Sequence, residues 1–228
     1  MEQKLAVDLV AFDVGGTTVR EEGIVPYALR QALEPLGVRP SDEAIAAVRG
    51  VSKRQAIASL VRGGLPGQRD RVEELANDAY QRFVARLQTA YAEGPVFEAP
   101  GASAVFAWLR ERGVKVALTT GFDRGTRDVI LRRLGWGDGR LDAVVSAEDV
   151  SAGRPAPYML FRAMELTGTW SVHRLAAVGD TVADLEAGAN AGARFVVGVL
   201  GGAHDLKTLG CVRHSHVIAQ LEDLRQIL

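Results

Sequence analysis

This sequence of 228 residues has little cysteine, a small net charge and no long apolar run. Cys211 is the single cysteine, which excludes a disulfide framework and a cysteine-based zinc site. The 27 basic residues nearly balance the 28 acidic ones, so no strong field favours nucleic acid or an anionic membrane. No run approaches the roughly 18 apolar residues of a membrane span, and no signal-peptide pattern opens the chain. We therefore expect a cytoplasmic protein that binds neither nucleic acid nor membrane.

The pattern of apolar residues predicts an α/β fold. The apolar run at 5–12 has the length of a buried strand, and a glycine-rich loop follows it at 13–18. Further strands are expected near 114–120, 143–146, 175–178 and 194–199, with helices between them. This alternation is typical of a doubly wound, Rossmann-like parallel sheet with right-handed crossovers.

A helical stretch interrupts this alternation between the first and second strands. It extends from about Tyr27 to Tyr91 and contains Ser41 and Ser52 as expected helix N-caps. The sequence therefore predicts a core domain of residues 1–20 and 97–228, with an α-helical cap domain of residues 21–96 inserted in it. Glycines and prolines near both crossings are typical of linkers.

Polar residues stand at the ends of three expected strands, where open parallel sheets bind ligands. They are Asp13 after the first strand, Thr119, Thr120 and Gly121 at the end of the second, and Asp180 after the fourth, followed by Asp184. Two carboxylates at neighbouring strand ends suit Mg²⁺, which prefers hard oxygen ligands, and an aspartate can also attack phosphorus. Arg154 lies in a Gly/Pro loop that opens a helix and suits an anion. Singly, each aspartate is also compatible with a helix cap or turn.

In order and spacing, these residues resemble the haloacid dehalogenase superfamily of phosphotransferases. The likeness rests on the segment Asp13-Val14-Gly15-Gly16-Thr17, the two threonines, Arg154 and the pair Asp180 and Asp184. It implies that Asp13 is the nucleophile and that Thr119 or Thr120, with Arg154, contacts phosphate oxygens. It further implies Mg²⁺ as cofactor, held by Asp13, Gly15 and Asp180 with Asp184 in support. Gly15, Gly16, Thr17 and Gly121 would surround the phosphate.

Two departures from the common phosphatase pattern indicate one branch of that superfamily. Most of its phosphatases carry a second aspartate two residues after the nucleophile as general acid and base, whereas this sequence has Gly15. The cation of the third motif is usually lysine, and here it is Arg154. Both features resemble the phosphonatase branch, whose members hydrolyse the carbon–phosphorus bond of phosphonoacetaldehyde.

Lys53, at the expected start of a cap helix, resembles the lysine with which that branch forms a Schiff base. A lysine amine attacks only when neutral, and its ordinary pKa of about 10.4 keeps it charged at neutral pH. The positive end of a helix favours the neutral amine. An iminium accepts the electron pair of the leaving carbon, so no acid at position 15 is needed. Phosphonatases have a histidine three residues later, where this chain has Ala56. A solvated surface lysine is the alternative interpretation.

Three functions remain open from the sequence. The first is magnesium-dependent cleavage of a small phosphonate through Asp13 and Lys53, and the second is hydrolysis of a small phosphate monoester. The third is a non-catalytic protein that binds phosphate ligands or a partner. The expected ligand is a small phosphorylated or phosphonate metabolite, and the sequence does not decide whether the chain forms a homodimer.

Overall fold

The computed structural model describes residues 5–20, 22–137 and 139–228. Within these ranges, six parallel strands form one sheet in the order β3-β2-β1-β4-β5-β6. The strands are β1 (Leu9–Asp13), β2 (Lys115–Thr120), β3 (Ala143–Ser146), β4 (Leu175–Gly179), β5 (Phe195–Val199) and β6 (His216–Ile218). The strand order reverses between β1 and β4, which is the position where doubly wound sheets bind ligands. The predicted α/β fold is confirmed.

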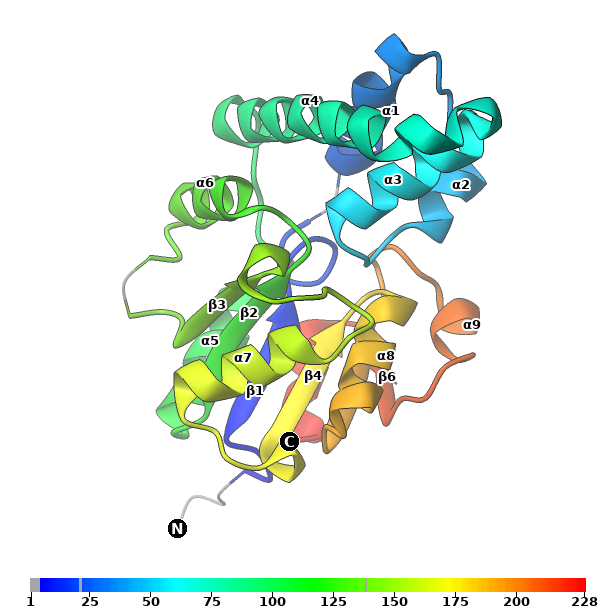
Figure 1. Cartoon of the computed structure of the whole chain (residues 1–228). Coiled ribbons are helices and arrows are strands. Elements are labelled where there is room, and N and C mark those ends of the chain that lie inside the picture. The colour runs from blue at the N-terminus through cyan, green and yellow to red at the C-terminus, as the bar shows by residue number, and fades with distance from the viewer. Residues whose placement is uncertain (1–4, 21, 138) are drawn as a thin grey trace.

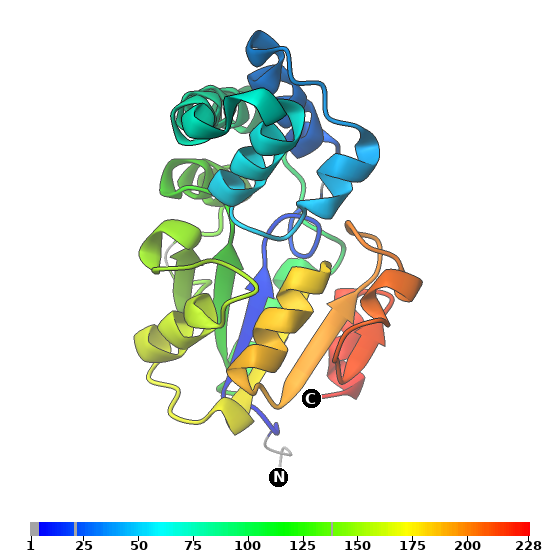
Figure 2. The same ribbon diagram turned by 45° about the vertical axis from the view of Figure 1, so that its right-hand side comes forward.

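The sheet is covered by helices on both faces, as Figures 1 and 2 show. The core helices are α5 (Ala102–Glu111), α6 (Arg124–Leu134), α7 (Tyr158–Thr167), α8 (Val182–Ala191) and α9 (Leu206–Leu209), with short 3₁₀ turns η3 (Ala147–Asp149), η4 (Val172–Arg174) and η5 (Leu221–Gln226). Alternate residues of β1 face opposite layers. Leu9 and Ala11 pack with residues of α7 and α8, whereas Val10 and Phe12 pack with α5. Burial on both faces explains the continuous apolar run of this strand.

The segment between β1 and β2 forms the helical cap seen above the sheet in Figure 1. Its helices are α1 (Ile24–Leu33), α2 (Asp42–Ala47), α3 (Lys53–Gly64) and α4 (Val72–Glu93), with 3₁₀ turns η1 (Glu34–Leu36) and η2 (Pro66–Arg71). Helix α4 packs against α1 and α3, and also lies along α6 of the core. The Ser41 and Ser52 hydroxyls accept hydrogen bonds from the third following backbone N–H group, which confirms both expected N-caps. None of the described helices is long and apolar enough to cross a membrane.

The two chain segments that enter and leave the cap lie side by side. Val19 forms a β-bridge with Glu98, and the Arg20 N–H donates to the Phe97 carbonyl at 3.0 Å. This contact supports the proposed division into a core of residues 1–20 and 97–228 and a cap of residues 21–96, of which residues 1–4, 21 and 138 lie outside the described ranges.

Several boundaries differ from the sequence expectation. The strand expected over 5–12 pairs only from Leu9, and the first cap helix begins at Ile24 instead of Tyr27. The helix that follows the Ser41 cap is short and ends at Ala47. Strand β6 was not expected, because three residues carry too little periodicity to indicate a strand.

Candidate active site

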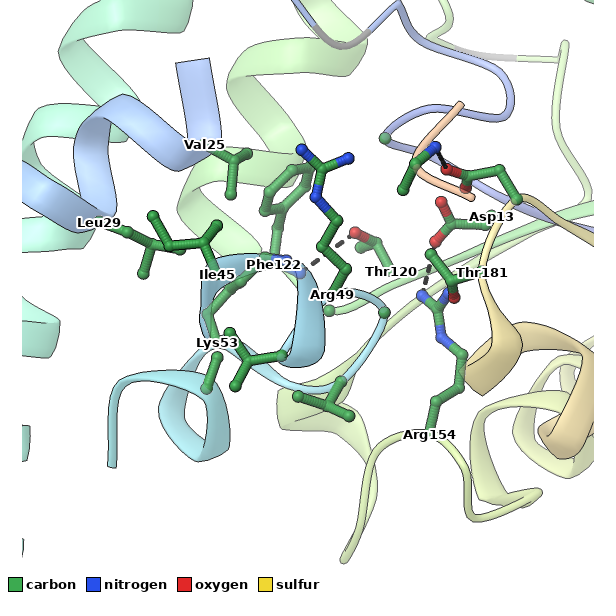
Figure 3. Close-up of a pocket in the computed structure, with 18 of the residues that line it drawn as sticks. Asp13, Val25, Leu29, Ile45, Arg49, Lys53, Thr120, Phe122, Arg154 and Thr181 are labelled. Carbon is green, nitrogen blue, oxygen red and sulfur yellow. Dashed lines mark hydrogen bonds and ion pairs between the residues drawn. The ribbon is translucent and has the colours of Figure 1, made fainter. Parts of the chain in front are cut away.

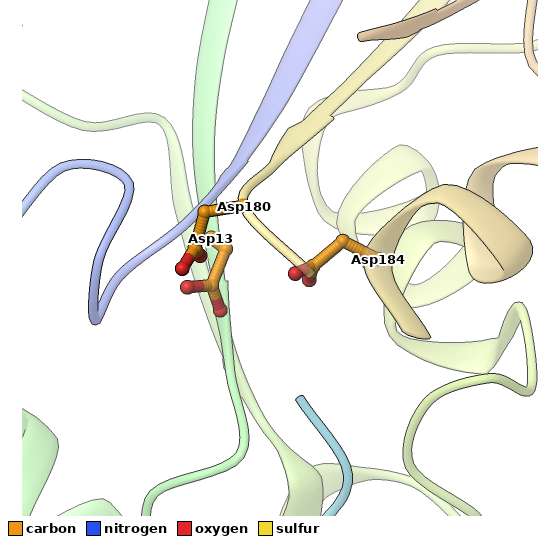
Figure 4. A group of neighbouring side chains, drawn as sticks. All are labelled: Asp13, Asp180 and Asp184. Atoms are coloured by element: carbon orange, nitrogen blue, oxygen red, sulfur yellow. The ribbon is translucent and has the colours of Figure 1, made fainter. Parts of the chain in front are cut away.

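Two aspartates meet at the point where the strand order reverses, as Figure 4 shows. Asp13 ends β1, and Asp180 directly follows the neighbouring β4. Asp180 is fully buried, and it accepts hydrogen bonds from the Thr17 hydroxyl at 2.9 Å and the Ala203 N–H at 2.6 Å. A Cβ at Gly16 would lie 2.3 Å from an Asp180 oxygen, so only glycine allows the loop after β1 to approach so closely. These contacts fix the Asp180 carboxylate beside Asp13.

Arg154 bridges two carboxylates in the same cluster. One terminal guanidinium nitrogen lies 2.6 Å from an Asp13 oxygen, and the other forms an ion pair with Asp184. The second Asp184 oxygen accepts the Thr181 N–H at 3.0 Å as part of the capping box that begins α8. Because both of its oxygens are engaged, Asp184 orients Arg154 toward Asp13. The planar fork of arginine suits such a double pairing.

The electrostatics of the two neighbouring carboxylates favour a metal ion. Burial, and next the negative charge of Asp13, raise the pKa of Asp180 to about 6. Oxygen atoms of Asp13, Asp180 and Asp184 all lie within 4.8 Å of one another. A dication would relieve the repulsion between the first two, and their hard oxygens fit Mg²⁺. The donor set present therefore fits the cofactor expected from the sequence.

A pocket lies above this cluster, between the core and the cap, and Figure 3 shows its side chains. From the core it is lined by Asp13, Thr120, Phe122 and Arg154, and from the cap chiefly by Val25, Leu29, Ile45, Arg49, Lys53 and Ala56. Its volume is about 60 Å³. A single water molecule needs about 10 to 15 Å³, so the pocket has room for a small metabolite only.

Lys53 reaches the pocket from the first residue of α3, directly after the N-cap Ser52. The side chain is half-buried, and its amine lies 5.5 Å from the centre of the Phe122 ring. It is therefore placed between the cap and the core and near the positive end of a helix.

The loop that carries Lys53 closes directly on the core. A Cβ at Gly50, which has φ = +80°, would lie 2.2 Å from the Thr181 hydroxyl oxygen. The Val51 carbonyl oxygen would lie 3.0 Å from a Cβ at Gly121. These four residues also line the pocket, so the loop forms part of its wall.

Comparison with known proteins identifies the family. The family model for haloacid dehalogenase-like hydrolases matches residues 7–192. Relatives named phosphonoacetaldehyde hydrolase include one from Bacillus cereus, 33% identical over 223 residues, and one from Bacillus anthracis, 32% identical over 222 residues. Each comparison covers 89% of this chain and 79% of the relative. This chain is a haloacid dehalogenase-like hydrolase.

Solved structures confirm the fold of this hydrolase. A phosphonoacetaldehyde hydrolase-like protein from Oleispira antarctica has a TM-score of 0.80 at 20% identity, covering 98% of this chain and 92% of that one. A predicted phosphoglycolate phosphatase from Haemophilus somnus has a TM-score of 0.80 at 16% identity, covering 99% of each chain. Membership of a hydrolase family sets aside the non-catalytic interpretation. Enzymes of this family generally use Mg²⁺.

The structure of the hydrolase brings most of the predicted site residues together and separates a few. The pocket lining includes Asp13, Gly15, Lys53, Thr120, Gly121, Arg154 and Asp180. Thr119 is not among them, since its hydroxyl is directed to the Phe12 carbonyl at 3.4 Å. The Gly16 N–H donates to the Val19 carbonyl, and Thr17 donates to Asp180. Gly16 and Thr17 therefore support the carboxylate cluster and do not face the pocket.

Phe122 and Arg49 are pocket residues of the hydrolase that the sequence did not single out. The Phe122 ring lies 3.4 Å from where a Cβ on Gly15 would stand, so it occupies the space beside the missing acid. Arg49 enters the pocket from the turn between α2 and α3. The position of Phe122 after the Thr120-Gly121 pair was a usable signal, but no periodicity marks Arg49.

Proposed function

We propose that this hydrolase cleaves the carbon–phosphorus bond of phosphonoacetaldehyde or a closely similar small carbonyl phosphonate. The observation that carries the proposal is the placement of Lys53 in the same pocket as Asp13 and Arg154, with Gly15 at the position of the usual acid. The relatives named phosphonoacetaldehyde hydrolase support the same substrate class.

In this proposal, Mg²⁺ would be held by Asp13, the Gly15 carbonyl and Asp180. Asp184 holds Arg154. When bound, the ion neutralises charge on the phosphoryl group and on Asp13. Arg154 is placed to contact phosphoryl oxygens because it already touches Asp13, the expected nucleophile. The Thr120 hydroxyl accepts the Phe122 N–H at 3.1 Å, so its own proton is free to be donated to the same group.

Lys53 supplies the electron sink in this proposal. Its neutral amine condenses with the substrate carbonyl, releasing water and forming an iminium. The Asp13 carboxylate then attacks phosphorus, and the carbon–phosphorus electron pair moves into the iminium to give an enamine. The enamine carbon then takes up a proton to give an imine. Hydrolysis of this imine releases the aldehyde and regenerates Lys53, while a second water releases phosphate from Asp13. No proton donor is needed at position 15.

Hydrolysis of a phosphate monoester is the second candidate. Ala56 favours it, because phosphonatases have a histidine at this position, and a solved structure of the same fold is described as a phosphoglycolate phosphatase. In that case Lys53 would bind substrate charge and form no covalent bond.

The deciding experiment measures phosphate release from phosphonoacetaldehyde and from a panel of phosphate monoesters, with and without Mg²⁺. We expect metal-dependent release from the phosphonate, and loss of that activity in Lys53→Arg, which keeps the charge but forms no imine. Borohydride added with substrate should attach the carbon skeleton to Lys53, located by mass spectrometry. Turnover of monoesters alone, with an active Lys53→Arg variant, would establish the second candidate instead.

A further inference from the structure

Arg49 is a cation in the pocket that the proposed reaction does not use. It is half-buried and lies in the turn between α2 and α3, four residues before Lys53. Its guanidinium forms no hydrogen bond or ion pair with any residue in 5–20, 22–137 or 139–228. Arg154, by contrast, is paired with both Asp13 and Asp184. One positive charge therefore remains without a protein counterpart on the cap side.

The surroundings of Arg49 are poorly suited to an unpaired charge. Val25, Leu29 and Ile45 line the same side of the pocket, and in Figure 3 the Arg49 side chain extends into the space between them and Asp13. Apolar walls exclude water and strengthen any ion pair formed there. Buried Ala56 contributes only a methyl group to this lining, which leaves room for a substituent on the substrate.

We propose that Arg49 binds a carboxylate of the substrate, so that this hydrolase prefers a phosphonate 2-oxo acid to the simple aldehyde. The inference rests on the proposed carbon–phosphorus cleavage through Lys53 and names its substrate class. In 3-phosphonopyruvate a carboxylate replaces the aldehyde hydrogen of phosphonoacetaldehyde, and the carbonyl keeps its separation from phosphorus. The same lysine chemistry therefore applies, and the planar guanidinium of arginine matches a carboxylate with two parallel hydrogen bonds.

The reaction balances with water as the only other reactant. Lys53 and the oxo group form an iminium and release one water. The phosphoryl group passes to Asp13, and the carbon–phosphorus electron pair becomes the double bond of the enamine. The enamine carbon takes up a proton, water hydrolyses the imine to pyruvate, and a second water releases phosphate from Asp13. Arg49 holds the carboxylate throughout and takes no part in bond making.

The test compares kcat/KM for 3-phosphonopyruvate and phosphonoacetaldehyde in three proteins. The wild-type enzyme should prefer the oxo acid by at least about tenfold. Arg49→Gln should lower kcat/KM for the oxo acid about 100-fold and that for the aldehyde by much less, reversing the preference. Arg62→Gln is the matched control, because it removes the same charge from an exposed cap position outside the pocket and should keep the wild-type preference.

A second readout separates this inference from the proposed function. Pyruvate and acetaldehyde are each incubated with borohydride, and labelling of Lys53 is measured. Faster labelling by pyruvate, lost in Arg49→Gln, supports carboxylate binding. Cleavage of the aldehyde alone, or an equal effect of Arg49→Gln on both substrates, overturns the inference and leaves the phosphonatase proposal intact. No labelling of Lys53 by either compound, with turnover of monoesters only, overturns both.

Discussion

Thr119 and Thr120 point to opposite faces of the sheet, because consecutive strand residues alternate. Thr120 faces the pocket, and Thr119 faces the Phe12 carbonyl. We expect Thr120→Ala to lower kcat about 10- to 100-fold, since one hydrogen-bond donor to the phosphoryl group is lost. Thr119→Ala should have the smaller effect on kcat. Steady-state kinetics of the two variants check this order, and a larger loss in Thr119→Ala would contradict it.

The expected role of Arg154 depends on the directions of its two terminal nitrogens as well as on its charge. A lysine at this position keeps the charge but does not reach Asp13 and Asp184 with separate parallel donors. We expect Arg154→Lys to reduce kcat about 100-fold, as measured by phosphate release with saturating Mg²⁺. Arg174→Lys, at an ion pair with Asp8 outside the pocket, is the control. Similar losses in both variants would show a general structural effect.

At the scale of elements, the loop before α3 holds the cap against the core. Gly50 and Gly37 both have positive φ, but only Gly50 has a core atom, the Thr181 hydroxyl oxygen, within the reach of an added Cβ. We expect each alanine variant to lose about 1 kcal/mol of stability from backbone strain. Gly50→Ala should also lower kcat/KM about tenfold or more, because the cap no longer closes fully.

Gly37→Ala provides the control for this prediction, since nothing lies within 4 Å of its added Cβ. Thermal unfolding gives the stability of both variants, and kcat/KM gives their activity. Equal activity of the two variants would mean that the approach of Gly50 to Thr181 has no role in closure.

Elements with strong patterns were predictable from sequence, and those fixed by tertiary contacts were not. Strands β2 to β5 and both serine caps lie close to their expected positions, because apolar runs and capping residues act locally. The residues before Leu9 continue the apolar run, yet Asp8 pairs with Arg174 and the ladder begins only after it. Strand β6 exists because it pairs with β5, a contact that its own three residues do not indicate.

The same limit applies to the candidate site. The order of motifs predicts that Asp13, Asp180 and Arg154 lie close together, and the structure brings them into one cluster, because strand ends of one sheet meet at one edge. It did not separate Thr119 from Thr120, nor reveal that Thr17 serves Asp180. Those distinctions depend on side-chain directions, which only the packed structure defines.

At the scale of the whole molecule, the pocket exists only where the two parts of the chain meet. The core supplies the carboxylates and Arg154, and the cap supplies Lys53 and Arg49. The contact of α4 with α6 and the bridge between Val19 and Glu98 hold the cap above the strand ends. In the proposed reaction, the core therefore supplies the phosphoryl-transfer residues, and the cap supplies both the imine-forming lysine and the cation for a substrate carboxylate.

The pH dependence of metal binding follows from the buried carboxylates. Burial and Asp13 raise the pKa of Asp180 to about 6, from an ordinary value of 3.8. In the metal-free protein, ionised Asp180 therefore destabilises the fold. This penalty is absent below about pH 3.8, develops as the pH rises and is complete above about pH 6. Mg²⁺ binding relieves it, so the thermal stabilisation by Mg²⁺ should be larger at pH 7.5 than at pH 5.

Because Mg²⁺ must displace a proton from Asp180 below pH 6, its affinity should fall about tenfold for each further pH unit. Calorimetric titration of Mg²⁺ between pH 5 and pH 8 measures this slope. Asp180→Asn removes both the charge and the titration, so it should bind Mg²⁺ weakly and with little pH dependence in this range. A wild-type affinity that is constant from pH 5 to pH 8 would mean that Asp180 is not a ligand. In that case, the loss of melting temperature on chelation of Mg²⁺ should also be the same at pH 5 and at pH 7.5.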